Sequence, residues 1–271
     1  MPLNELKPPL KWAGGKSWLV PHLRPLWEAY AARLPNVRLV EPFCGSLAVT
    51  LGLRPTQALL NDQNPHLINF HRWLQRGLVI DLPMENDATL YYQHRARFND
   101  LIASGAAESS EAAALFYYLN RTGYNGLCRF NQRGLFNVPF GQHKQINYQR
   151  DFRGYAAILQ PWTFSVGRFD SVALCEDDFI YADPPYDVEF TQYAKEGFSW
   201  ADQQHLAEWL SHHSGAVALS NQATERVVRL YESLGFRLHY FDAPRRINSS
   251  GDRTPAREVL ALRGIETSGE A

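Results

Sequence analysis

The chain has 271 residues, of which 45% are hydrophobic and 20% charged, and its formal net charge is −1. These proportions are typical of a soluble globular protein and exclude a disordered chain. No apolar run approaches the roughly 18 residues that a membrane-spanning helix needs, and the N-terminus lacks the apolar core of a secretion signal. The three cysteines are too far apart for a disulfide scaffold or a zinc site built on cysteine pairs. We therefore expect a cytoplasmic protein.

Short apolar runs of strand length recur along the chain and alternate with helical patterns, which is typical of an α/β fold. They lie at residues 37–40, 58–60, 179–182, 216–219, 236–241 and 259–262. Between the second and third runs, residues 89–103 and 111–119 are predicted to form helices. Ser109 and Ser110 are candidates for capping the latter helix. The pattern predicts an α/β core that is split around an inserted, largely helical domain.

Basic residues are clustered, although the net charge is close to zero. Residues 121–150 contain five lysine or arginine residues and no aspartate or glutamate. Smaller groups of basic residues lie at 7–16 and 245–257. A near-neutral chain with local basic patches is typical of an enzyme that acts on a polyanion. Charge alone leaves open the alternative of solvated basic faces on any soluble enzyme.

The sequence Asp183-Pro184-Pro185-Tyr186 directly follows the apolar run 179–182. Such a strand end puts a carboxylate at the carboxyl edge of a sheet, where open α/β folds bind ligands. The prolines stiffen the loop and leave carbonyls that only accept hydrogen bonds. A carboxylate beside a carbonyl suits the two N–H donors of an exocyclic amino group and stabilises charge that develops on its nitrogen. The tyrosine offers a flat face to a nucleobase.

Two other motifs point to a nucleotide-like ligand. The run 37–40 leads into a turn containing Gly45, where glycine allows a close approach of the backbone to a ligand. Asp62 follows the next run and suits the hydroxyls of a ribose. Near the N-terminus, tandem glycines separate Trp12 from Lys16 in a turn that can present a cation and a stacking face. Neither GxGxxG nor GxxxxGK[ST] occurs, so dinucleotide and P-loop sites are not expected.

The order of these motifs resembles that of the α-group adenine-N6 DNA methyltransferases, the Dam type, over nearly the whole chain. The match runs from Lys-Trp-Ala-Gly-Gly-Lys at 11–16 through Glu-Pro-Phe-x-Gly at 41–45 to Asp-Pro-Pro-Tyr at 183–186. The most specific stretch, residues 119–141, is similar to the Dam recognition hairpin. Ser220-Asn221 and Asn248-Ser249-Ser250 also resemble family segments. The resemblance implies transfer of a methyl group from S-adenosylmethionine to N6 of an adenine that is flipped out of duplex DNA.

The resemblance also implies the fold. We expect a Rossmann-like class I methyltransferase core with a mixed, mostly parallel seven-stranded sheet, and an inserted, largely helical target-recognition domain with a β-hairpin. The S-adenosylmethionine-binding catalytic domain is expected at residues 1–65 and 161–271, and the DNA-binding target-recognition domain at 66–160.

The site residues follow from the same resemblance. The expected catalytic residues are Asp183, Pro184, Pro185 and Tyr186. Asp183 and the Pro184 carbonyl would hold the adenine amino group, and Tyr186 would stack on the ring. The expected cofactor-binding residues are Trp12, Ala13, Gly14, Gly15, Lys16, Glu41, Pro42, Phe43, Gly45, Asp62 and Asp183.

A second set of residues is expected to bind DNA. Its members are Lys11, Asn120, Arg121, Tyr124, Asn125, Leu127, Arg129, Asn131, Arg133, Asn137 and Pro139. Arg129 is the favoured base reader, because arginine on a guanine edge is the commonest specific contact in the major groove. The basic residues assigned to phosphates, which position DNA without specifying its sequence, are Arg121, Arg133, Lys144 and Arg150.

No metal is expected, because the histidines lack metal-ligand spacing and a sulfonium is already an activated leaving group. Cys44 is interpreted as a packing residue. The chain departs from the family at Leu47, where a second glycine is usual, and at Gln142 and His143, where the Dam pattern has Arg and Tyr. GATC is the expected target, and a different target would point to Gln142 and His143.

The expected partner is double-stranded DNA, without a membrane. We expect a monomeric, bacterial or phage-encoded enzyme, either an orphan methylase or one that shares its site with a cognate restriction endonuclease. One alternative is an amino-methyltransferase that acts on cytosine N4, RNA or protein glutamine. The other is a catalytically silent DNA-binding regulator, for which binding without methyl incorporation would be the evidence.

Overall fold

A computed structural model describes residues 6–186, 198–243 and 256–265. Asn248-Ser249-Ser250 and most of the basic group at 245–257 lie outside these residues. Among the described residues, none of the helices has the length and apolar character needed to cross a membrane.

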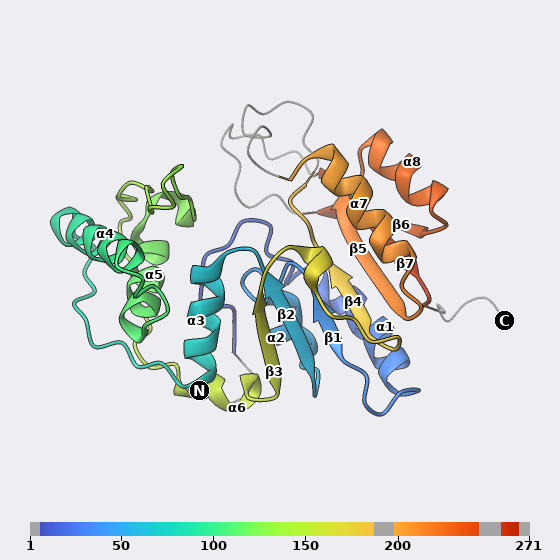
Figure 1. The fold of residues 1–271 in the computed structure, drawn as a ribbon, viewed down its shortest axis with the longest axis horizontal. Helices are drawn as coiled ribbons and strands as arrows, with labels where there is room; N and C mark the ends of the chain where they lie inside the picture. The colour runs from blue at the N-terminus through green and yellow to red at the C-terminus, as the bar shows by residue number, and fades with distance from the viewer. Residues whose placement is uncertain (1–5, 187–197, 244–255, 266–271) are drawn as a thin grey trace. The chain divides into compact units, whose positions relative to one another are not determined.

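The chain folds into alternating strands and helices (Figure 1). The strands are β1 (Leu39–Glu41), β2 (Ala58–Asp62), β3 (Trp162–Val166), β4 (Phe179–Ala182), β5 (Ala216–Gln222), β6 (Arg237–Ala243) and β7 (Ala256–Arg263). The helices are α1 (Val20–Ala31), α2 (Ala48–Leu53), α3 (Pro65–Gln75), α4 (Ala88–Ala103), α5 (Ser110–Thr122), α6 (Arg153–Leu159), α7 (Trp200–Ser211) and α8 (Glu225–Ser233). The six apolar runs all form strands, whereas β3 was not predicted.

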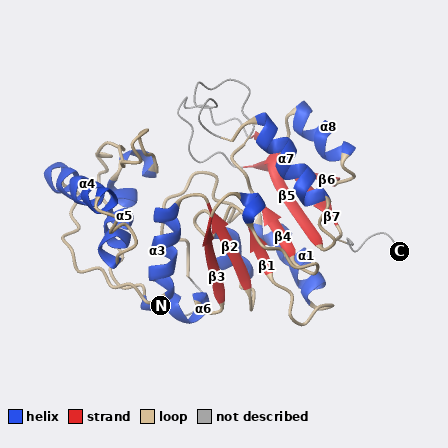
Figure 2. Ribbon diagram, in the orientation of Figure 1, coloured by secondary structure: helices blue, strands red, loops and turns tan. Residues whose placement is uncertain are grey.

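The strands form a seven-stranded sheet in the order β3-β2-β1-β4-β5-β7-β6 (Figure 2). β1 is parallel to β2 and to β4, and β4 is parallel to β5. β7 is antiparallel to both β5 and β6. The sheet is therefore mixed and mostly parallel, which confirms the predicted fold class. Parallel strands that are covered on both faces read as continuous apolar runs, and this explains why β4 and β5 were visible in the sequence.

The chain divides into two compact units with discontinuous bounds. Unit 1 comprises Met1–Trp18, Gly45–Arg54 and Asn64–Val166, and unit 2 comprises Leu19–Cys44, Pro55–Gln63 and Gly167–Ala271. These are groupings by contact, and the functional division into residues 1–65 with 161–271 and residues 66–160 stays a prediction.

Unit 1 is built around α5, most of whose side chains are buried. α3 and α4 pack against α5, and α6 packs against α3. Side-chain caps start three of these helices: Asn64 caps α3, Asp87 caps α4 and Ser109 caps α5. Ser109 is thus the N-cap, and Ser110 is the first residue of the helix. The expected β-hairpin is present as two isolated antiparallel bridges, Gly123 with Phe140 and Phe130 with Phe136.

Unit 2 contains the core of the sheet. α7 and α8 cover one face, where buried side chains such as Leu206 and Tyr231 join Ile180 and Ala182 of β4 in one apolar cluster. α1 lies against the alternate side chains of β4, with the ring of Trp27 edge-on to that of Phe179 at 5.6 Å between centroids. Because both faces of β4 are buried, the position of the residues that follow it is fixed by the core.

Candidate active site and DNA-recognition surface

The residues that follow β4, Asp183 to Tyr186, are called the catalytic loop below. Ser220 on the neighbouring strand β5 donates a hydrogen bond from Oγ to Asp183 Oδ1 at 2.8 Å. The Tyr181 hydroxyl lies 3.0 Å from the same Oγ. Both Ser220 and Tyr181 are buried, so the Asp183 carboxylate is held from inside the core. Farther along the loop, Gln203 on α7 donates a hydrogen bond from Nε2 to the Pro185 carbonyl at 2.8 Å.

Tyr186 has an inward-facing hydroxyl. Burial raises its pKa, and the neighbouring carboxylates of Asp183 and Glu258 raise it further. Glu258 lies on β7 and is only 8% exposed. A phenol in these surroundings stays protonated in the physiological range, so Tyr186 can pack or stack but does not serve as a base.

The turn after β1 is tied to the end of β2. Asn61 donates hydrogen bonds from Nδ2 to the carbonyls of Pro42, at 3.0 Å, and Gly167, at 2.9 Å. The Cys44 amide donates to the Asn61 carbonyl at 2.8 Å. The Cys44 thiol is buried, and burial raises its pKa well above the usual value. The negative charges of Asp62 and Glu41 raise this pKa further. The thiol is therefore protonated and packs in the turn, as expected.

The predicted cofactor residues of unit 2 are placed by this turn and by the strand ends. Glu41 is the last residue of β1 and is 2% exposed, and Pro42 is also buried. The ring of Phe43 is partly buried, with its centroid 5.7 Å from that of Phe169. Asp62 is the last residue of β2 and is partly exposed.

The predicted cofactor residues 12–16 of unit 1 lie in a second turn, and Trp12 packs against Gly45 from the turn after β1. A Cβ on Gly45 would lie 2.9 Å from Trp12 Nε1, and Gly45 has a positive φ of 47°. His71 on α3 contacts the Gly45 carbonyl through Nε2 at 2.7 Å. Burial lowers the pKa of His71 to about 4, so the ring is neutral and Nε2 donates. Lys16 is buried and donates from Nζ to the Gly14 carbonyl at 3.1 Å, while Ala13, Gly14 and Gly15 are exposed.

Residues 123–141, called the recognition turn below, are joined to Lys11 by the buried Asn120. The Asn120 side chain accepts from the Lys11 amide at 2.8 Å and donates to the Lys11 carbonyl at 2.8 Å and to the Gly126 carbonyl at 3.2 Å. A Cβ on Gly126 would lie 2.5 Å from Lys11 Cβ, so only glycine allows this contact. Asn120 is 1% exposed and supports Lys11 and the turn, and its expected contact with DNA stays a prediction.

The first part of the recognition turn presents side chains to solvent. Tyr124 is 50% exposed and Leu127 is 39% exposed. Asn125 between them is exposed and has a positive φ of 53°. The exposed Arg129 donates from Nε to Asn137 Oδ1 at 2.9 Å, which orders its guanidinium at the surface.

Supports from α4 hold the recognition turn by its backbone. Asn99 accepts from the Phe136 amide at 2.8 Å and donates to the Phe136 carbonyl at 3.1 Å. Tyr91 and Arg95 both donate to the Val138 carbonyl, at 2.9 and 3.0 Å.

The remaining predicted DNA contacts lie in and after the turn. Asn131 is exposed, but its Oδ1 accepts from the amides of Arg133 and Leu135 and shapes the turn. Four other residues predicted to contact DNA are also exposed: Arg133, Pro139, Lys144 and Arg150. Arg121 is partly buried and donates from Nη2 to the Asn147 carbonyl at 3.3 Å.

Of the three departures from the family, Leu47 is buried with a positive φ of 65° before α2, and His143 contacts Lys11. Gln142 has a positive φ of 48°, and the next residue, His143, brings Nε2 to 3.3 Å from Lys11 Nζ and 3.1 Å from the Gly123 carbonyl. Lys11 Nζ also donates to the Arg121 carbonyl at 3.0 Å. Burial lowers the pKa of Lys11, and the charge of Arg121 lowers it further.

Comparison with known proteins identifies the family. Residues 12–247 match the model of the D12 class N6 adenine-specific DNA methyltransferases. The chain is 36% identical to the retron Ec67 DNA adenine methylase of Escherichia coli, over 94% of this chain and 90% of that protein. The chain belongs to the D12 class of N6 adenine-specific DNA methyltransferases. It is therefore an enzyme that transfers a methyl group from S-adenosylmethionine to N6 of adenine in DNA.

Other relatives agree with this assignment. The chain is 36% identical to a DNA adenine methylase of Vibrio cholerae and 35% identical to that of Escherichia coli K12, in both cases over 93% of this chain and 94% of the relative. A solved structure from Listeria monocytogenes, described as a class I S-adenosylmethionine-dependent methyltransferase, aligns with a TM-score of 0.45 at 11% identity, over 100% of this chain and 64% of that one.

The residues of this D12 methyltransferase suit its methyl donor. β1, β2 and β4 are parallel neighbours, so Glu41, Asp62 and Asp183 lie at the same, carboxyl edge of the sheet. Carboxylates can accept hydrogen bonds from ribose hydroxyls and can face the cationic part of S-adenosylmethionine, and the partly buried ring of Phe43 can contact its adenine. The donor set therefore fits the cofactor.

Several residues that hold the predicted site were absent from the prediction. They are Asn61, His71, Asn99 and Gln203, and Ser220 was noted only as part of a family segment. Each is polar and distant in sequence from its partner. A polar residue on the apolar face of a helix is the available signal: Gln203 shares one face of α7 with Leu206, Ala207 and Leu210.

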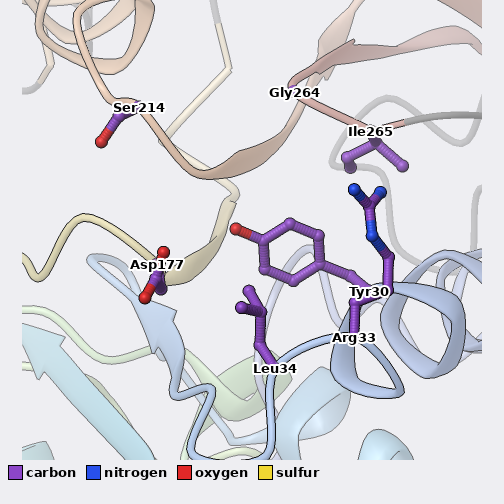
Figure 3. Close-up of a pocket in the computed structure, with 7 residues that line it drawn as sticks. All are labelled: Tyr30, Arg33, Leu34, Asp177, Ser214, Gly264 and Ile265. Atoms are coloured by element: carbon purple, nitrogen blue, oxygen red, sulfur yellow. The ribbon is translucent and has the colours of Figure 1, made fainter.

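Unit 2 of the D12 methyltransferase contains a cavity of about 580 Å³ (Figure 3). Its lining residues are Tyr30, Arg33, Leu34, Asp177, Ser214, Gly264 and Ile265. Asp177 precedes β4 and Ser214 precedes β5, so the cavity is at the amino edge of these strands, opposite to Asp183. Within the described part of the chain, His, Cys, Asp and Glu residues form no cluster that could hold a metal ion.

Proposed function

We propose that the catalytic loop binds the amino group of a flipped adenine, with Asp183 and the Pro184 carbonyl accepting its two N–H bonds. The observation that carries this proposal is the hydrogen bond from Ser220 to Asp183 at 2.8 Å, which fixes a carboxylate at the carboxyl edge of β4. When bound, S-adenosylmethionine supplies a methyl group that is already activated on a sulfonium. The two acceptors keep the N6 lone pair available and stabilise the charge that develops on N6.

The other predicted site residues take supporting roles in this proposal. Tyr186, which stays protonated, stacks on the adenine ring, and Asp62 accepts from the ribose hydroxyls of the cofactor. Trp12 and Gly45, which pack against each other, are assigned to cofactor binding by the same resemblance. The remaining expected cofactor residues shape the turns in which they lie: Ala13, Gly14, Gly15, Lys16, Glu41, Pro42 and Phe43.

The recognition turn is proposed to read a GATC-like site in duplex DNA. Support comes from the similarity of residues 119–141 to the Dam hairpin and from the exposure of Tyr124, Leu127 and Arg129. Arg129 is assigned to a base edge, and Tyr124 and Leu127 to bases next to the flipped adenine or to the space that it leaves. The exposed basic residues Arg133, Lys144 and Arg150 are assigned to DNA phosphates.

Cellular context belongs to the same proposal. The enzyme is proposed to act as a monomer in the cytoplasm, either alone or on a site shared with a cognate restriction endonuclease. Sedimentation of the enzyme with and without a short duplex tests the monomer, because a second copy on the DNA would raise the mass of the complex.

The Asp183→Ala variant tests the catalytic assignment. Loss of the carboxylate removes an acceptor that acts on the developing charge, so methyl transfer should fall by roughly 10²- to 10³-fold or more. Transfer of radiolabelled methyl groups to duplex DNA measures the rate, and DNA binding is measured in parallel. Asp177→Ala, at the exposed opposite edge of the sheet, is the matched control and should keep full activity. Full activity of Asp183→Ala would overturn the assignment.

A further inference from the structure

Gln203 is an amide buried on the apolar face of α7. Its side chain is 1% exposed and lies on the same helix face as Leu206, Ala207 and Leu210, which belong to the apolar core. Burying a primary amide without hydrogen-bond partners is unfavourable. The partners of Gln203 therefore indicate why a polar residue is placed there.

These partners form a chain of hydrogen bonds in which Asn221 donates to Gln203 and Gln203 donates to Pro185. Gln203 Nε2 donates to the Pro185 carbonyl at 2.8 Å, and Gln203 Oε1 accepts from Asn221 Nδ2 at 3.0 Å. Asn221 Nδ2 also lies 3.1 Å from the Tyr231 hydroxyl, and Asn221 Oδ1 accepts from the Gln222 amide at 2.8 Å.

The chemistry of the two ends fixes the orientation of both amides. A prolyl carbonyl can only accept, so Gln203 must turn its NH₂ group towards Pro185. The Gln222 amide can only donate, so Asn221 must turn its oxygen towards Gln222 and its NH₂ group towards Gln203. A flip of either amide would break the chain at both of its contacts.

The hydrogen bond to Pro185 restrains a loop whose two prolines cannot donate backbone hydrogen bonds. Pro184 and Pro185 have no backbone N–H, so neither can donate a hydrogen bond that would order the loop. The direction of the Pro185 carbonyl defines the peptide plane between Pro185 and Tyr186, and thereby the direction in which Tyr186 leaves. Ser220 and Asn221 are consecutive on β5 and point to opposite faces. Ser220 thus holds Asp183 directly, while Asn221 holds Pro185 through Gln203.

We propose that Gln203 is a positioning residue for methyl transfer, which holds the Pro185 carbonyl and thereby sets the directions of the Pro184 carbonyl and of Tyr186. This inference rests on the proposed role of the catalytic loop in binding adenine. Gln203 itself touches neither substrate, and Asn221 and Tyr231 keep its amide in the required orientation.

The Gln203→Glu variant tests this role because it keeps the shape and removes the donor. When it is ionised, the introduced carboxylate faces the Pro185 carbonyl and repels it. A shift of the reacting groups by about 1 Å costs on the order of 10²-fold in rate, so kcat should fall by that order while the KM for DNA and the Kd for S-adenosylmethionine stay within about twofold. Gln204→Glu, the exposed neighbour on the same helix, is the matched control and should behave as wild type.

The pH dependence of Gln203→Glu separates positioning from a structural defect. A protonated carboxyl can donate to the Pro185 carbonyl through its O–H while its other oxygen accepts from Asn221. The ratio of the kcat of Gln203→Glu to that of wild type should therefore rise as the pH falls. A ratio that is independent of pH, or a kcat equal to that of wild type, would overturn the proposal.

Tyr231→Phe gives a second test if Gln203→Glu does not fold. It removes the hydroxyl at the far end of the chain and keeps the ring in the core, so kcat should fall by less than in Gln203→Glu, with unchanged DNA affinity. A wild-type kcat in Tyr231→Phe would contradict the hydrogen-bond chain. If Asp183→Ala is inactive and Gln203→Glu is fully active, the positioning role alone fails; if Asp183→Ala is fully active, the proposed function itself fails.

Discussion

The catalytic loop and the recognition turn are held in different ways. In the catalytic loop, the buried Ser220 donates a hydrogen bond to the side chain of Asp183, a predicted catalytic residue. In the recognition turn, Asn99 and Asn120 bind backbone groups, and side chains in its first part, such as Tyr124 and Leu127, are left exposed. A reacting group must be held close to its productive position by its neighbours, and the hydrogen bond from Ser220 does this for Asp183. Substitutions in the two regions should therefore change different quantities.

Ser220→Ala should give the larger effect, and it should be on rate. It removes a hydrogen bond to a charged group, worth about 1.5–3 kcal/mol, which corresponds to a fall in kcat of roughly 10- to 100-fold. DNA affinity and sequence preference should be unchanged, since the recognition turn is not altered. Steady-state methylation of a duplex with one site measures kcat and KM. A change in KM with an unchanged kcat would contradict the distinction between the two regions.

Arg129→Ala should change the choice of sequence instead. Loss of a bidentate contact to a guanine costs about 1–3 kcal/mol of discrimination, and it should relax specificity at one base pair. Competition between cognate and singly substituted duplexes measures it. The control is Arg133→Ala, in the same turn, which should weaken binding to all sequences alike and reduce the slope of log affinity against log salt by about 1. Unchanged discrimination in Arg129→Ala would remove its assigned role.

His71→Gln should have the smallest effect on methyl transfer, and its measurable effect should be on stability. The pKa of His71 is about 4 in the folded protein and about 6.5 in a free histidine, so the unfolded chain binds the extra proton as the pH falls below about 6.5. Stability is thereby lost between pH 6.5 and pH 4, by about 2 kcal/mol at pH 5 relative to pH 7. Glutamine does not titrate, and its amide can still donate to the Gly45 carbonyl.

Urea unfolding at pH 7, 6 and 5 checks this prediction. Wild type should lose more of its free energy of unfolding on acidification than His71→Gln does. His66, whose pKa is also lowered by burial, is present in both proteins and cancels in the comparison. Equal losses would show that His71 is not the buried neutral group described above.

The strands were predictable where burial on both faces gives an uninterrupted apolar run in the sequence. β4 and β5 are buried on both faces and appear as uninterrupted apolar runs. β3 was missed because its buried positions Trp162 and Phe164 alternate with polar or exposed ones, so no continuous run marks it. Helices α4 and α5 were found within a few residues because their caps and apolar spacing are local signals.

The site was predictable only in part, for a related reason. Motif residues such as Asp183 to Tyr186 are contiguous and carry their chemistry in their order. Their supports, such as Gln203 and His71, bind carbonyls that lie 18 and 26 residues away in the chain, and no local pattern encodes that pairing. Asn120 was assigned to DNA because it stands in a DNA-binding motif, and that assignment stays a prediction; its burial and its hydrogen bonds to Lys11 and Gly126 could not be seen in the motif.

The most direct test of the account is the methylation of a mixed-sequence plasmid with S-adenosylmethionine, followed by single-molecule sequencing for modified bases. The account predicts N6-methyladenine confined to one short motif, GATC, and none with Asp183→Ala. A different single motif would keep the catalytic assignment and overturn the predicted target, with Gln142 and His143 as the first residues to exchange. An absence of N6-methyladenine, with protein that still binds the cofactor and DNA, would contradict the central claim.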